Sequence, residues 1–295
     1  MSAERKPLDA TAFSVMVLLT ALWGCQQVAI KLTAPDVSLV MQAGIRSILA
    51  TLLLVAWARL RAIPLLARDG TLGAGVLAGV LFGGEFVFIY AGLAHTAASR
   101  MVVFIYLAPI FTALGLQAFV PGERLAPLQW LGAALAFAGV ALAFSDGFAG
   151  AGGTWLGDLF GIVAAALWAA TTVLIRATGL ARVTATKTLF YQLLVSALML
   201  PLASMAMGEQ GVVALTPLAL ASLAYQGVIV AFASYLAWFW LLTRYLAGRL
   251  AVFSFLTPLF GVLAGVLVLG ESLTPSFALA ALLVGAGIVL VNRAR

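Results

Sequence analysis

Apolar runs of about twenty residues follow one another along the chain, with short polar gaps between them. A helix needs about 20 mainly apolar residues to cross the hydrocarbon core of a bilayer. The runs predict ten spanning helices, at residues 12–31, 38–58, 72–93, 99–119, 126–145, 157–177, 185–207, 217–241, 249–269 and 275–292. The expected fold is therefore an all-α integral membrane protein with short loops and no room for a soluble domain.

Two segments of the chain each occur twice. YLAPIFTALGLQAFVPGERLAP at Tyr106–Pro127 returns as FLTPLFGVLAGVLVLGESLTP at Phe255–Pro275. Each copy is an apolar helix that contains a proline, followed by a Gly-Glu turn and the start of another apolar helix. ALWGCQQVAIKLT at 21–33 returns in the same way as ALWAATTVLIRAT at 166–178. Matched blocks in the same order indicate two tandem copies of one unit.

The two predicted units span residues 1–147 and 148–295, with five helices in each. An odd number of helices means that the second unit enters the membrane inverted relative to the first. Inverted repeats related by a pseudo-two-fold axis in the membrane plane are typical of transporters, which hold the substrate near the midplane between the repeats. The repeat therefore predicts alternating access around a central cavity.

The composition excludes several classes of protein. Hydrophobic residues make up 64% of the chain and charged residues only 9%, whereas soluble chains carry about 25% charged residues. The net charge is +6, but the basic residues sit in short gaps between apolar runs, which indicates membrane topology and not nucleic-acid binding. Cys25 is the only cysteine and His95 the only histidine, so an internal disulfide and a His/Cys metal cluster are both excluded.

The distribution of basic residues predicts the orientation. With the N-terminus inside, 13 of the 16 lie in cytoplasmic segments, two in external segments and one within a helix. The cytoplasmic ones are Arg5, Lys6, Arg59, Arg61, Arg68, Arg124, Arg176, Arg182, Lys187, Arg244, Arg249, Arg293 and Arg295, the external ones Lys31 and Arg100, and the intramembrane one Arg46. This bias places both termini in the cytoplasm. We interpret the first apolar run as a retained helix and not a signal peptide, because its Ala-Leu-Trp sequence recurs at 166–168.

These motifs carry a family resemblance that covers nearly the whole chain. They are the Ala-Leu-Trp opening followed by Lys31 or Arg176, and the proline and Gly-Glu pairs, Pro109 with Gly122-Glu123 and Pro258 with Gly270-Glu271. With two five-helix units, they resemble the EamA domain of the drug/metabolite transporter superfamily. Within it the chain is similar to the YddG-type exporters of aromatic amino acids. The resemblance implies efflux of amino acids and related metabolites across a bacterial inner membrane.

Two charged residues lie deep inside predicted helices, where burying a charge costs at least about 2.5 kcal/mol. Arg46 and Glu85 lie at similar depth in consecutive antiparallel helices. They could pair with each other, which would be a structural role. Alternatively, Glu85 could face the cavity and bind a substrate ammonium or carry a proton. Ser234 is the repeat partner of Glu85, so any role of this carboxylate belongs to one half only.

Aromatic and polar residues supply the other candidate site residues. Aromatic walls suit large apolar side chains and ammonium groups, although aromatics near helix ends are more often part of the interfacial belt. Trp23 and Trp168 recur at equivalent mid-helix positions, which fits either cavity lining or packing. The residues expected to line the cavity are Trp23, Gln26, Arg46, Phe82, Glu85, Phe86, Tyr90, Trp168, Tyr235 and Trp238.

Pro109 and Pro258 are the hinge candidates. Each removes a backbone hydrogen bond near the middle of a spanning helix, at equivalent sites in the two halves. A kink at both sites would let one side open while the other closes, but a static kink that improves packing would also preserve the prolines.

The sequence predicts a secondary transporter that exports amino acids, without a cofactor and not an enzyme. No phosphate-binding loop is present, so ATP does not drive transport directly, and no catalytic set converges. Glu85 is the coupling candidate if protons drive export; facilitated export is the alternative. Drugs, nucleotide sugars and other metabolites are alternative cargoes, and a membrane enzyme or channel is a more distant alternative. One pair of repeats forms a complete cavity, so the predicted transporter can work as a monomer.

Overall fold

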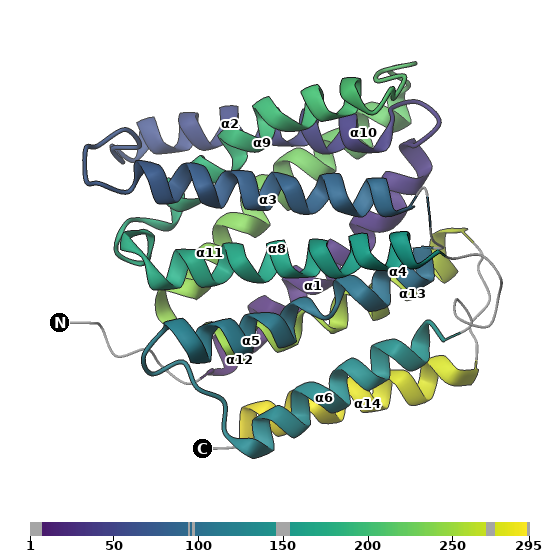
Figure 1. Ribbon diagram of the computed structural model, residues 1–295. Coiled ribbons are helices and arrows are strands. Elements are labelled where there is room, and N and C mark those ends of the chain that lie inside the picture. Colours follow the sequence, from purple (N-terminus) through teal and green to yellow (C-terminus); the bar gives the residue numbers. More distant parts are fainter. Residues whose placement is uncertain (1–7, 94, 96–97, 146–153, 270–274, 294–295) are drawn as a thin grey trace.

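The computed structural model describes residues 8–93, 95, 98–145, 154–269 and 275–293 (Figure 1). Within them the chain is helical, and its segments lie side by side as a bundle. In chain order they are α1 (Ala10–Thr33), α2 (Leu39–Leu60), α3 (Leu72–Leu93), α4 (Ala98–Ile105), α5 (Ala108–Phe119), α6 (Pro127–Ala143), α8 (Trp155–Ala177), η1 (Gly179–Arg182), α9 (Ala185–Ala206), α10 (Pro217–Ala224), η2 (Tyr225–Ser234), α11 (Tyr235–Arg244), α12 (Ala247–Phe253), α13 (Leu256–Leu269) and α14 (Pro275–Arg293).

These helices confirm the predicted all-α membrane fold. Eight apolar segments of the described chain are long enough to cross a membrane, and two shorter apolar helices lie at Pro127–Ala143 and Ala278–Asn292. The predicted spans agree with the observed helices to within a few residues. The α4–α5 and α12–α13 pairs each form one span, and α10, η2 and α11 together form another. The proposed boundary between residues 147 and 148 lies outside the described residues and stays a prediction.

Equivalent helices of the two halves run antiparallel to each other. Gly44 near the start of α2 lies against Pro201 near the end of α9. Gly132 near the start of α6 lies against Gly287 near the end of α14, while Gly139 lies against Ala280. In both pairs a helix of the first half meets its own counterpart in the opposite direction, as inverted repeats require.

The small residues at these contacts let the backbones approach closely. Small residues also allow close contact between α3 and α9, where Gly75 faces the Tyr191 ring and Gly79 faces Val195. A methyl group at either glycine would lie within 3 Å of those side chains. The tight contact makes α2, α3 and α9 one packed unit.

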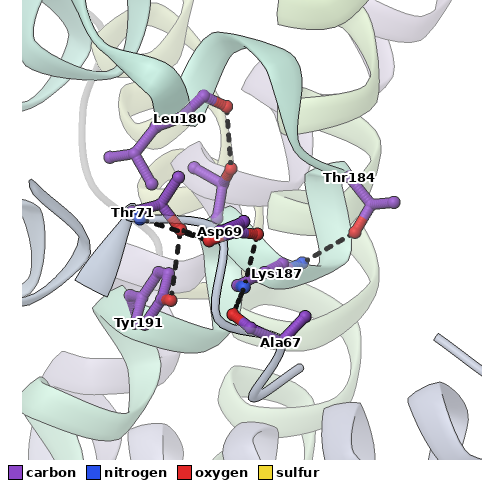
Figure 2. Close-up of polar contacts among 8 residues, drawn as sticks. Ala67, Asp69, Thr71, Leu180, Thr184, Lys187 and Tyr191 are labelled. Carbon is purple, nitrogen blue, oxygen red and sulfur yellow. Dashed lines mark hydrogen bonds and ion pairs between the residues drawn. The ribbon is translucent and has the colours of Figure 1, made fainter. Parts of the chain in front are cut away.

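A polar cluster fastens this unit on the side of the bundle where α1 begins and α14 ends, hereafter the terminal side (Figures 1 and 2). Lys187 of α9 donates hydrogen bonds from Nζ to Asp69 Oδ2 at 2.7 Å and to the Ala67 carbonyl at 2.8 Å. Thr71 Oγ1 donates to Asp69 Oδ1 at 2.6 Å and lies 3.3 Å from the Tyr191 hydroxyl. Hydrogen bonds from Lys187 and Thr71 lower the pKa of Asp69 from 3.8 to about 2. The α2–α3 loop of the first half is thereby tied to the second half.

A second polar cluster connects α2 and α9 on the opposite side of the bundle, hereafter the far side. Glu209, just after α9, accepts hydrogen bonds from the backbone N–H groups of Val40 and Met41 at 3.1 and 3.2 Å. These groups lie in the first turn of α2, where the helix dipole favours a negative charge. Ser204 donates to the same carboxylate at 2.6 Å. The α2–α9 pair is therefore fastened at both ends.

Pro109 and Pro258 lie just after two-residue interruptions of their helices, at the sites where the sequence predicted kinks. The α4 helix ends at Ile105 and α5 begins at Ala108; α12 ends at Phe253 and α13 begins at Leu256. At each break the chain makes a tighter turn, in which Leu107 and Phe255 donate to carbonyls only three residues earlier. Each proline then occupies the first turn of the new half-helix, where a missing N–H costs nothing.

Candidate functional site

A cavity of about 670 Å³ lies in the centre of the bundle, between the two halves. This volume falls within the range of small-molecule sites, about 300–1,000 Å³. The cavity is bordered by α1, α3, the two broken helices, α8 and α11, which are the helices expected from the sequence, and also by Arg46 of α2 and Gln192 of α9. Most of its wall is apolar.

The cavity extends to the far side of the bundle. Lys31 and Ala34 at the end of α1, Leu39 at the start of α2 and Leu93 at the end of α3 all border it. Phe144, directly after α6, also borders it. Towards the terminal side the lining stops at residues such as Ile175 and Phe239.

A buried ion pair closes the terminal side. Arg176, at the end of α8, forms a salt bridge with Glu123 of the α5–α6 turn, and both side chains are almost fully buried. Arg176 also donates to the Leu242 carbonyl at 2.8 Å, while the Ala247 N–H donates to Glu123 at 3.4 Å. The pair therefore joins α8 and the α5–α6 turn to the α11–α12 connection, across the two halves.

Two further contacts reinforce this closure at the start of α1. The Tyr245 hydroxyl donates to Asp9 Oδ2 at 2.8 Å. The rings of Phe13 and Phe253 meet edge to face, with centroids 5.4 Å apart. The first helix is thus held against the α11–α12 connection and α12. The terminal side is therefore closed, and the described lining of the cavity extends towards the far side instead.

Five aromatic rings form a continuous wall of the cavity. The Trp23 ring lies 6.2 Å from Tyr235 and 5.9 Å from Trp238, edge to face in both cases. Phe82 lies 5.9 Å from the same Tyr235 and 5.3 Å from Phe86. Such a wall can hold a large apolar group, or a cation over a ring face.

Trp23 and Trp168 occupy matched positions but have different surroundings. Trp23 Nε1 donates a hydrogen bond to Ser234 Oγ at 2.9 Å, and Ser234 donates in turn to the Val230 carbonyl. Trp168 lies edge to face with Tyr106, at 6.0 Å. The position that matches Ser234 in the other half is Glu85. The second half of the site is therefore built with a neutral hydroxyl where the first has a carboxylate.

A polar corner of the cavity, made of Arg46, Glu85, Tyr90 and Tyr235, interrupts the aromatic wall. The Arg46 guanidinium carbon lies 4.4 Å above the centre of the Phe86 ring. Tyr90 and Tyr235 interact electrostatically with both Arg46 and Glu85. Within the described chain Arg46 and Glu85 do not form an ion pair with each other, so the structure does not contain the simple structural pair that the sequence left open.

The helix that carries Tyr235 changes its winding just before this ring. Residues Tyr225–Ser234 form a π-helix, and α11 then begins at Tyr235. Wider helical turns of this kind occur frequently at functional sites. Gln226, inside the π-helix, donates to the Gln42 side chain at 2.9 Å, which anchors the segment to α2.

All ten residues expected to line a cavity border this one, as do Pro109 and Pro258. Several polar residues of the lining were not among the ten, including Thr112, Ser254 and Thr257. Thr257 directly precedes Pro258 in the repeated block, so its place at a helix break was the signal available. The counterpart motif residues Gly270 and Glu271 lie outside the described residues. Among the residues that are described, no group of three His, Cys, Asp or Glu side chains could hold a metal ion.

Comparisons with known proteins give the same architecture. The model of the EamA-like transporter family matches residues 11–145 and again 155–293. An uncharacterized transporter of Archaeoglobus fulgidus is 28% identical over 97% of this chain and 98% of its own. A probable amino-acid metabolite efflux pump of Escherichia coli is 25% identical over 93% of this chain and 92% of its own. A crystal structure at 21% identity superposes with a TM-score of 0.82 over 96% of each chain, which supports the fold alone.

Proposed function

Because the chain belongs to the EamA-like transporter family, we propose that it exports amino acids, aromatic and other apolar ones included, across a bacterial inner membrane. The observation that carries the proposal is the cavity itself, in which a wall of aromatic rings meets the polar corner of Arg46 and Glu85. An apolar amino acid offers the matching surfaces: one large apolar side chain and one charged end. The name of the Escherichia coli relative agrees with this cargo.

Transport proceeds by alternating access. Both termini lie in the cytoplasm, as the excess of basic residues on the terminal side favours, so the present state faces outward and is the state that releases cargo. The helix breaks beside Pro109 and Pro258 allow the half-helices to change angle separately. Release of the Arg176–Glu123 pair opens the cytoplasmic side to the next cargo molecule. The cavity lies within one chain, so a monomer suffices.

Glu85 is the coupling candidate. It is a carboxylate of the cavity wall, 8% exposed, and it stands where the second half has Ser234. If a proton accompanies each export cycle, Glu85 is the group placed to carry it. Facilitated export down the cargo gradient needs no such group.

Other small metabolites or drugs are the second candidate cargo. The mostly apolar wall of the cavity and its volume of about 670 Å³ favour this alternative, because neither feature requires a charged end. Nucleotide sugars fit less well, since a diphosphate calls for a cluster of basic residues at the centre of the cavity.

The decisive experiment is the uptake of labelled phenylalanine, methionine and threonine into proteoliposomes, with and without a pH gradient, for the native chain and Glu85→Gln. We expect phenylalanine and methionine to move. Transport that needs the gradient and is lost in Glu85→Gln makes this carboxylate the coupling site. Transport that ignores the gradient and survives in Glu85→Gln indicates facilitated export. Movement of none of the three overturns amino-acid export in favour of the other cargoes.

A further inference from the structure

Arg46 is a buried cation whose hydrogen-bonding capacity the protein uses only in part. It lies in the middle of α2 and is 2% exposed. Within the described chain, Nε and one terminal nitrogen of its guanidinium have no hydrogen-bond partner. A buried charged donor without an acceptor is costly, and an intramembrane charge marks a functional site by default. Arg46 also borders the central cavity.

Arg176 is a buried arginine with a structural role, and the protein supplies acceptors for both of its terminal nitrogens. Its two terminal nitrogens reach the Glu123 carboxylate and the Leu242 carbonyl. Arg46 has the carboxylate of Glu85 nearby, but within the described chain the two side chains form no ion pair. The Arg46 guanidinium carbon instead lies 4.4 Å above the centre of the Phe86 ring. A guanidinium placed over an aromatic face can still donate hydrogen bonds from its edge.

The surroundings of Arg46 define the anion that would fit. A guanidinium binds a carboxylate with two parallel hydrogen bonds. The carboxyl group of Glu85, in the same polar corner, can accept a hydrogen bond from an ammonium group, which favours a cargo that carries an ammonium as well as a carboxylate. The neighbouring rings of Phe82, Phe86 and Tyr235 offer an apolar surface to the rest of the molecule.

We propose that Arg46 binds the carboxylate of the cargo, so that the transporter distinguishes amino acids from amines and amides of the same size. This inference rests on the proposed function, because it names the group by which the same cavity selects an amino acid. The specificity is located in the first half alone: Gln192 is the residue of α9 that faces the cavity at the matching depth, and it has no charge.

The test compares phenylalanine with two analogues in proteoliposomes that contain the purified chain. Unlabelled phenylalanine, phenylalaninamide (no carboxylate) and 3-phenylpropionate (no ammonium) compete with labelled phenylalanine. In the native chain we expect the amide to compete at least about tenfold more weakly than phenylalanine. In Arg46→Gln, we expect the KM for phenylalanine to rise about 10- to 100-fold, while inhibition by the amide stays the same. The ratio of the inhibition constant of the amide to the KM for phenylalanine therefore falls towards one.

Two further variants control for folding and charge. Arg61→Gln removes an exposed arginine that stacks on Trp57 outside the cavity, and we expect the native ratio in this variant. Arg46→Lys keeps the positive charge but loses the two-pronged geometry, and we expect an intermediate ratio. If Arg46→Gln does not yield folded protein, as judged by gel filtration and thermal unfolding, the Arg46→Lys ratio decides.

The outcomes distinguish carboxylate binding by Arg46 from amino-acid export in general. A native chain that transports phenylalanine, with a ratio that is unchanged in the Arg46 variants, overturns the role of Arg46 and leaves amino-acid export intact. A native chain that transports no amino acid overturns both. A ratio that falls in Arg46→Gln and not in Arg61→Gln supports carboxylate binding by Arg46.

Discussion

The two halves of this transporter share one plan but differ at the residues that carry charge. Arg176 at the end of α8 is buried against Glu123 and closes the terminal side. Its counterpart at the end of α1, Lys31, borders the far end of the cavity. Ser234 beside Trp23 is matched by Glu85 in the other half. Duplication has kept the helices, breaks and tryptophans, whereas the polar residues have diverged. The scaffold is therefore symmetric, and the chemistry is not.

The largest effect is expected where the halves differ most, at the closed side. Glu123→Gln leaves the Arg176 guanidinium buried without its carboxylate, which should cost about 3–5 kcal/mol of stability and open the terminal side. Thermal unfolding measures the stability. Maleimide labelling of Ala247→Cys, a fully buried position beside Glu123 and outside the cavity lining, measures the opening in a Cys25→Ala background, where it is the only thiol. We expect faster labelling in the Glu123→Gln variant.

A double variant separates these two effects. Glu123→Leu with Arg176→Leu replaces the pair by apolar groups, which is often neutral or stabilising for a buried ion pair. We expect the stability to recover and the labelling to stay fast. Native labelling in both variants would show that the ion pair does not hold the side closed.

An intermediate effect is expected at the two tryptophans. Trp23→Phe removes the hydrogen bond to Ser234 and should weaken the affinity for phenylalanine about 2- to 10-fold, since one such bond contributes about 0.5–1.5 kcal/mol. Trp168→Phe keeps an aromatic ring beside Tyr106, and we expect a change below about twofold. Competition assays in proteoliposomes measure both. Equal losses in the two variants would mean that the halves contribute alike.

The smallest effect is expected at the Asp69–Lys187 contact that ties the halves together on the terminal side. Because the pKa of Asp69 is lowered to about 2, its contribution to stability is present above pH 4 and disappears as the pH falls towards 2. Asp69 is 34% exposed, so solvent screens the pair. Asp69→Asn should lower the melting temperature by about 2 °C at pH 7.

Melting curves at pH 7, 4 and 3 test this expectation. The difference between the native chain and Asp69→Asn should shrink as the pH drops below about 4. Lys187→Met removes the partner and should abolish the same pH dependence. A difference between native and Asp69→Asn protein that stays constant down to pH 3 would contradict it.

The sequence was sufficient to predict the helices because the length of an apolar run and the thickness of a bilayer decide where a helix spans. The ten candidates, chosen as charged, aromatic or polar side chains within predicted helices, border the cavity, and their role in binding stays a prediction. The sequence did not predict whether Pro109 bends or interrupts its helix, because that depends on how Tyr106 and Leu107 pack. The stacking of Arg46 on Phe86 was also beyond it: only the packing of α2 beside α3 brings these side chains together.

The broken helices have a consequence for the direction of transport. Exchange of the two halves maps α12 onto α4 and α13 onto α5, so the opposite state can be assembled from the same kinds of contact. Two states of such similar construction differ in free energy only through the residues in which the halves differ. If no proton is coupled to transport, the ratio of cargo concentrations across the membrane alone decides the net flow. In that case, loading the outer compartment with cargo should reverse the flow and turn export into import.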